Sequence, residues 1–185
     1  MKSIVALFSG EGTNLLNLIQ KIHLKEIQIV GAITNNPNSP AIEKVREANI
    51  PVIVLDHKHY SSRELYDTEL VKLINTFSPD LVVLCGFMRI LTSIFTDSIQ
   101  AINLHPSLLP LFKGANAIEA SFYSTEPNGG ISIHWVSDEL DGGDIISQAS
   151  FVKKSSETLE TFTTKIHELE YEFLPKTIIE ILKDN

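Results

Sequence analysis

Positive charge and cysteine are both scarce in this 185-residue chain. It has 15 Lys and Arg residues against 23 Asp and Glu residues, for a formal net charge of −8. No Lys/Arg cluster outweighs the acidic background, which argues against a general nucleic-acid surface and leaves any anionic substrate to local groups. The single cysteine, Cys85, excludes an internal disulfide framework. Because it lies in the apolar run LVVLC, we expect a buried strand residue rather than a reactive thiol.

Long apolar runs are also absent. No stretch approaches the roughly 20 apolar residues of a membrane span, and the start, MKSIVALFSGEG, lacks the length and cleavage pattern of a signal peptide. We therefore expect a cytoplasmic protein with neither membrane nor nucleic-acid partners. With 43% hydrophobic residues, the 185-residue chain can form one well-buried core and is too short for two comfortable domains. We expect a single domain over residues 1–185.

Apolar, β-branched runs alternate with segments of helical spacing. Runs typical of strands buried on both faces cover 4–8, 27–34, 51–55, 81–85 and 101–105. Helical spacing follows the first run from Leu15 and recurs over 41–49, over 61–77 and from Thr158 onward. Residues 130–136 and 145–152 alternate in polarity and are predicted to extend the sheet. This order predicts an α/β fold with a doubly wound, mostly parallel, Rossmann-like sheet.

A glycine-rich loop, SGEGTNL at 9–15, lies between the first strand and the first helix. Backbone N–H groups at such a helix start can hold a phosphate, and Thr13 and Asn14 add side-chain donors. The third glycine and the later acidic residue of a dinucleotide site are not clearly present, and there is no Walker lysine. The loop therefore fits a mononucleotide-like phosphate better than NAD or ATP, with a plain tight turn as the alternative.

The most informative pair of segments is INLHPSLLP at 102–110 and HWVSDELDGGDII at 134–146. Asn103 and His105 are two residues apart, so on a strand they share a face, and Pro106 ends the strand just after them. Asp141 lies in a glycine-rich loop and, beside the imidazole, would orient it and stabilise its charged form. An amide donor, a proton-transfer group and its carboxylate partner are what acyl transfer requires.

Other polar residues carry weaker signals. His134 fits a buried core histidine better than a support for the site. His57 and His59 form an H-x-H pair without a third ligand, so we expect a solvated loop and no metal. Arg63 follows two serines and suits either an anionic ligand tail or a solvated helix start. Arg89, in the apolar stretch GFMRIL, suits a flat heterocycle that carries carboxylates.

Five segments together resemble the phosphoribosylglycinamide formyltransferases. They are SGEGTNL, LVVLCGFMRIL, INLHPSLLP, FKGANAIEA (112–120) and VSDELDGGDII, in the family's order over nearly the whole chain. The resemblance implies an N-terminal ribonucleotide part and a C-terminal folate and catalytic part. The residues that it implies are Gly12, Thr13, Asn14 and Glu170 for glycinamide ribonucleotide, Arg63, Met88, Arg89, Ile90, Leu91 and Asn103 for folate, and Asn103, His105 and Asp141 for catalysis.

The resemblance also implies a reaction. The family transfers the formyl group of 10-formyltetrahydrofolate, a cosubstrate, to the amine of glycinamide ribonucleotide in de novo purine biosynthesis, without a metal. The amine attacks the formyl carbon directly, Asn103 and His105 meet the oxyanion, and the proton passes through Asp141 or a water. Two positions depart from the family pattern. Thr13 stands where Ser is common, which keeps the hydroxyl, and Ile131 stands where Thr is expected near the substrate strand.

The sequence leaves three other functions open. A formyltetrahydrofolate deformylase has similar catalytic residues but usually a regulatory domain before them, whereas this chain begins at its first strand. A methionyl-tRNA formyltransferase needs a further C-terminal domain and a basic RNA surface. A catalytically silent folate- or nucleotide-binding module is disfavoured by the intact Asn103, His105 and Asp141. The sequence leaves open whether the protein is a monomer or a homodimer.

Overall fold

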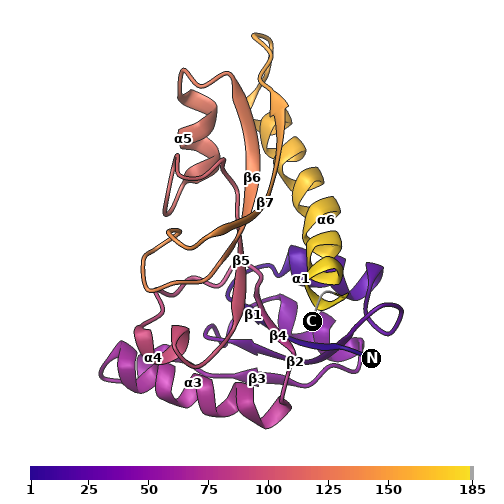
Figure 1. Ribbon diagram of the computed structural model, residues 1–185, viewed down its shortest axis with the longest axis vertical. Helices are drawn as coiled ribbons and strands as arrows, with labels where there is room; N and C mark the ends of the chain where they lie inside the picture. The colour runs from indigo at the N-terminus through magenta and orange to yellow at the C-terminus, as the bar shows by residue number, and fades with distance from the viewer. Residues whose placement is uncertain (184–185) are drawn as a thin grey trace.

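The computed structural model describes residues 1–183, which form one seven-stranded sheet with helices on both faces (Figure 1). The strands are β1 (Ser3–Phe8), β2 (Gln28–Thr34), β3 (Val52–Val54), β4 (Leu81–Leu84), β5 (Ala101–His105), β6 (Asn128–Trp135) and β7 (Ile145–Val152). The helices are α1 (Thr13–Lys21), α2 (Ala41–Glu47), the 3-10 helix η1 (His57–His59), α3 (Arg63–Phe77), α4 (Ser93–Thr96), α5 (Ala117–Tyr123) and α6 (Leu159–Lys183).

The sheet order is β3-β2-β1-β4-β5-β6-β7. The first five strands pair in parallel, and β6 and β7 add two antiparallel strands beyond β5. The predicted α/β class and mostly parallel sheet are therefore confirmed, as are the two strands that extend it. The short helices α4 and α5 were not anticipated, because four and seven residues give too few turns for helical spacing to show.

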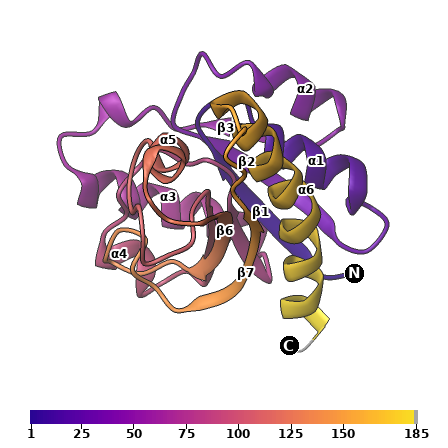
Figure 2. The same ribbon diagram turned by 90° about the horizontal axis from the view of Figure 1, so that it is seen from above.

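Alternate residues of the central strands face two separate cores. In β1, Ile4 and Phe8 point into the core under α1, α2 and α6, whereas Val5 and Leu7 point into the core under α3 and α4. All four side chains are completely buried. Helices α1, α2 and α6 accordingly lie together on one side of the sheet (Figure 2). Because both faces are covered, these strands read as near-continuous apolar runs.

The carboxyl ends of the parallel strands define where polar groups gather. The glycine loop follows β1, Asn35 follows β2, Asp56 lies two residues beyond β3 and His105 ends β5. Helix α6 crosses the same region and packs on α1 and β6. Within residues 1–183, no helix is both long and apolar enough to cross a membrane.

Candidate active site

Asn103 and His105 lie on the same face of β5, as their spacing predicts. His105 is 5% exposed, and its ring is held between two oxygens. Its Nε2 lies 2.8 Å from the Phe112 carbonyl oxygen, and its Nδ1 lies 3.4 Å from Asp141 Oδ2. Since a carbonyl and a carboxylate only accept hydrogen bonds, both ring nitrogens sit where a charged imidazolium would donate from each.

We call Asn103, His105 and Asp141 the trio. The Asp141 backbone is in the left-handed region, with φ 50°, and its carboxylate accepts a 2.8 Å hydrogen bond from the Gly114 backbone N–H. Burial alone would raise the pKa of Asp141. Hydrogen bonds from His134 and Gly114 and the nearby charge of His105 outweigh burial, so the pKa lies below its ordinary value. The carboxylate is therefore ionised at neutral pH.

His134, on the neighbouring strand β6, also contacts the trio. It is 2% exposed, as a core histidine would be. However, its Nε2 lies 3.2 Å from Asn103 Nδ2 and 3.6 Å from Asp141 Oδ1. Its Nδ1 donates to the Trp135 carbonyl at 2.9 Å, so the ring is held with Nε2 facing both the Asn103 amide and the Asp141 carboxylate. The expectation of a purely structural histidine was therefore incomplete, because His134 orients the Asn103 amide.

The trio lies in a cavity of about 770 Å³, here called the trio cavity. One wall is the segment that follows β4, in which Met88 and Ile90 are 79% and 48% exposed. Leu140 adds another exposed apolar side chain to the lining. The guanidinium of Arg89 lines this cavity too and lies 5.2 Å from the centre of the Tyr66 ring. The cavity therefore combines an apolar wall, one cation and a polar floor.

A second cavity of about 540 Å³ lies at the glycine loop, here called the glycine-loop cavity. Gly12, Thr13 and Asn14, the residues predicted to bind the ribonucleotide, are part of its lining. Gly12 is the residue before α1 and has φ 64°, and a Cβ there would lie 2.6 Å from the Ala41 side chain. Only glycine fits this turn, and a helix start beside a cavity has backbone N–H groups that can bind an anion.

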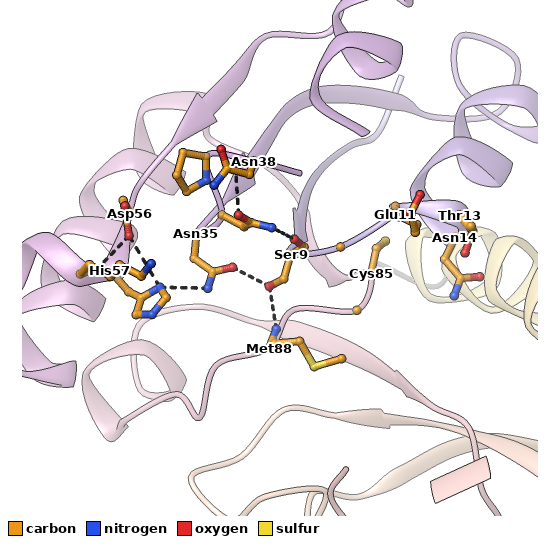
Figure 3. A pocket seen from close by; sticks show the side chains of 16 residues that line it. Ser9, Glu11, Thr13, Asn14, Asn35, Asn38, Asp56, His57, Cys85 and Met88 are labelled. Atoms are coloured by element: carbon orange, nitrogen blue, oxygen red, sulfur yellow. Dashed lines mark hydrogen bonds and ion pairs between the residues drawn. The ribbon is translucent and has the colours of Figure 1, made fainter. Parts of the chain in front are cut away.

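The glycine-loop cavity has asparagine side chains on its opposite wall (Figure 3). Asn35 lies between Ser9 and His57: the Ser9 hydroxyl donates to Asn35 Oδ1, and Asn35 Nδ2 lies 3.2 Å from His57 Nδ1. The Ser9 hydroxyl also accepts a 2.8 Å hydrogen bond from the Met88 backbone N–H. The solvated loop expected for His57 and His59 is thus wrong for His57, whose side chain is one-third exposed and has a protein partner.

The two cavities meet at Asn14, Gly86 and Met88, which line both. Glu170 of α6 lies at this border, where its carboxylate accepts a 3.3 Å hydrogen bond from Asn14 Nδ2. Burial raises the pKa of Glu170 to about 7, and the Asn14 hydrogen bond opposes this only in part. Burial, helped by the charge of Glu170, also raises the pKa of Cys85 to about 12. Cys85 is therefore buried and protonated, as expected from its place in an apolar run.

Other predicted positions fall outside the two cavities. Arg63 is exposed at the first residue of α3 and lines neither of them. Ile131 is 1% exposed in the apolar core, so its departure from the family pattern alters no cavity wall. Within residues 1–183, no group of three or more His, Cys, Asp or Glu side chains is placed to hold a metal ion.

Backbone groups at the site carried no signal in the sequence. The Phe112 carbonyl and the Gly114 N–H hold His105 and Asp141, but any residue has such groups. Gly114 has φ 81°, and its glycine in FKGAN was the one available hint of a turn. Ser132 was likewise missed, although its buried hydroxyl accepts from the Leu109 N–H at 2.9 Å and donates to the Ser107 carbonyl at 2.7 Å, fixing the turn after His105.

The fold and the residue types of the trio together fit a class, the α/β enzymes of acyl-group transfer, with the glycine-loop cavity beside the trio cavity. Comparison with known proteins narrows this class. The chain belongs to the formyl transferase family, whose model matches residues 1–178.

Relatives of known structure and sequence agree with this membership. A crystal structure of phosphoribosylglycinamide formyltransferase from Campylobacter jejuni is 46% identical, with a TM-score of 0.95, and the match covers 98% of this chain and 97% of that one. The Escherichia coli phosphoribosylglycinamide formyltransferase is 34% identical over 95% of this chain and 85% of its own. The trifunctional purine biosynthetic protein adenosine-3 of Gallus gallus is 36% identical over 95% of this chain, which spans 18% of that protein's length.

Proposed function

We propose that the protein transfers the formyl group of 10-formyltetrahydrofolate to the amine of glycinamide ribonucleotide. One observation carries the proposal: the trio lies in a cavity with an apolar wall, and that cavity shares Asn14 with the cavity at the glycine loop. A phosphorylated amine held at one cavity can therefore present its far end in the other. The names of the relatives, which span nearly the whole chain, support the same substrate.

Each substrate has groups in the two cavities that suit it. The phosphoryl group of the ribonucleotide is met by backbone N–H groups of Gly12, Thr13 and Asn14, where the helix dipole adds to the attraction. Glu170 at the border suits the ribose hydroxyls or the glycinamide amine. The flat ring system of the folate suits the exposed apolar side chains of Met88 and Ile90, and the cavity of about 770 Å³ is large enough for it.

The chemical step is direct attack of the amine on the formyl carbon. A new C–N bond forms to the glycinamide nitrogen, and the C–N bond to the folate nitrogen then breaks. The oxygen of the tetrahedral intermediate takes its hydrogen bonds from Asn103 Nδ2 and from His105 Nε2. In this structure His105 Nε2 is engaged by the Phe112 carbonyl at 2.8 Å, so the formyl oxygen must replace that carbonyl as the acceptor. One such donor lowers the barrier by about 3 kcal/mol.

Asp141 orients His105 and balances its charge throughout the reaction. Its low pKa keeps the carboxylate ionised, so it is able to accept a hydrogen bond from His105 or from the attacking amine. The amine proton leaves through Asp141 or a water and reaches the departing folate nitrogen. Ser107 takes no part as a nucleophile, because the residue is completely buried and its hydroxyl donates to the Leu111 carbonyl.

The test is a transfer assay with and without glycinamide ribonucleotide. The absorbance change of 10-formyltetrahydrofolate is followed, and formate is measured in parallel. We expect turnover only when the ribonucleotide is present, with no formate released. Formate release without the ribonucleotide would instead establish the deformylase, and no change in either assay would overturn formyl transfer to this acceptor.

A further inference from the structure

The wall between the two cavities is held by Ser9, the first residue of the glycine loop. Ser9 is 7% exposed, and every polar group that it has is used. Its N–H donates to the Gly86 carbonyl at 3.1 Å, and its carbonyl accepts from Asn36 Nδ2 at 2.9 Å. Its hydroxyl donates to Asn35 and accepts from the Met88 N–H at 2.8 Å. Ser9 thus joins the ends of three neighbouring strands.

Met88 belongs to the 86–92 segment, which is neither helix nor strand and whose residues 86–91 line the trio cavity. Such a segment keeps its shape through a few specific contacts. Its first half is bonded to Ser9. Its far end is bonded to Asp67 of α3, whose carboxylate accepts from Thr92 N at 2.6 Å and from Thr92 Oγ1 at 2.8 Å. The two anchors belong to different elements, and of the two only Ser9 lines the glycine-loop cavity.

We propose that the Ser9 hydroxyl is a positioning group that couples the two substrate cavities. This inference rests on the proposed function, because it needs a phosphorylated ligand at one cavity and a folate at the other. A phosphoryl group on the glycine loop orders the turn that starts at Ser9. The ordered turn keeps Ser9 on Asn35 and on the Met88 N–H, so the folate meets a wall that is already in place. Binding of either ligand therefore strengthens binding of the other by the same factor.

The experiment measures that factor with ligands that cannot react. Tetrahydrofolate lacks the formyl group, so its complex with glycinamide ribonucleotide does not turn over. Its Kd is measured with and without saturating ribonucleotide, and the ratio of the two values is the coupling factor. Loss of one hydrogen-bonded link corresponds to a change of about two- to tenfold. We expect Ser9→Ala to move the coupling factor toward one by that amount.

A matched control breaks the other anchor. Thr92→Val removes the Oγ1 hydrogen bond to Asp67 but touches neither cavity, so it should weaken tetrahydrofolate equally with and without ribonucleotide and leave the coupling factor unchanged. Asn35→Ala removes the acceptor of the Ser9 hydroxyl and replaces Ser9→Ala in the experiment if Ser9→Ala fails to fold. The double variant Ser9→Ala/Asn35→Ala should lose no more coupling than either single variant.

The possible outcomes separate this inference from the function on which it rests. A wild-type coupling factor of one, or an unchanged factor in both Ser9→Ala and Asn35→Ala, overturns the coupling while leaving formyl transfer intact. An equal loss of coupling in Thr92→Val shows general loosening of the wall and also overturns it. Failure of the wild-type protein to bind either ligand overturns the proposed function, and the coupling with it.

Discussion

The glycine-loop cavity and the trio cavity use different parts of the chain for recognition. The first offers backbone N–H groups in a turn that a single glycine conformation creates, and side chains there mainly hold neighbouring loops together. The second offers three side chains from β5 and the 136–144 loop, each of a different chemical type. We infer that side-chain chemistry can be altered in the trio without disturbing the turn, whereas the glycine-loop cavity responds chiefly to changes of backbone conformation.

The largest expected effect on the trio cavity comes from a change at Asp141. Asp141→Asn keeps the size of the side chain but removes the charge that faces His105 at 3.4 Å. We expect turnover to fall by about a hundredfold or more, because both the orientation and the charge of the imidazole are lost, while KM for either substrate changes little. His105→Ala and Asn103→Ala should show losses of the same order.

The control for this variant is Asp144→Asn, three residues further along and exposed. Its side chain lines neither cavity, so steady-state kinetics should match those of the wild-type protein. Near-normal turnover in Asp141→Asn or His105→Ala would remove the trio from the chemical step.

A backbone change tests the other side of the comparison. Gly12→Ala forces alanine into φ 64° and places its Cβ 2.6 Å from the Ala41 side chain. We expect KM for glycinamide ribonucleotide to rise by about tenfold or more as the N–H groups move away from the phosphoryl group, with a smaller effect on folate KM. Lys44→Ala is the control, because Lys44 is exposed on α2 and lines neither cavity. Equal kinetics for the two variants would contradict a phosphate-binding turn at Gly12.

Much of the sheet could be predicted because its strands are buried on both faces. An apolar run such as IVALF in β1 has no other stable place, and parallel pairing follows from its alternation with helices. Pairing of β5 with β6 was not foreseeable in its direction, because no short turn links these strands. Residues 106–127 lie between them and include α5, a helix too short for its apolar spacing to predict it.

The trio was predictable for a different reason. Asn103 and His105 share a strand face, and Pro106 marks where that face ends. By contrast, His134 and Ser9 reach the site only through pairing of distant segments, and their residue types occur just as often in ordinary cores. Backbone groups such as the Phe112 carbonyl have no sequence signal at all. Sequence therefore indicates candidate catalytic side chains, and only the fold shows what holds them.

The border between the cavities can be tested through Glu170, whose pKa burial raises from 4.5 to about 7. Between these values the unfolded chain has already lost the proton that the folded protein keeps, so rising pH favours unfolding until the folded group also ionises. Glu170→Gln stays neutral. Its stability relative to the wild-type protein should therefore rise by about 1–3 kcal/mol from about pH 4 to about pH 8.

Urea unfolding at both pH values measures this difference. Glu168→Gln, an exposed change on the same helix, should show no such trend. A constant stability difference between Glu170→Gln and wild type across this range would show that Glu170 is ionised and solvated at the border.

The smallest expected effect concerns Arg63, which is exposed and lies outside both cavity linings. If the long guanidinium side chain reaches an anionic folate tail that projects from the trio cavity, the ion pair is a solvated one and contributes little. We expect Arg63→Ala to raise the folate KM by about two- to fivefold with unchanged turnover, and the effect should fade as salt is added. Arg46→Ala on α2, whose guanidinium pairs with Glu43, is the control for a general change in charge. An unchanged folate KM in Arg63→Ala would confine folate recognition to the 86–91 wall and the trio, and would make the contrast between the two cavities one of local contacts alone.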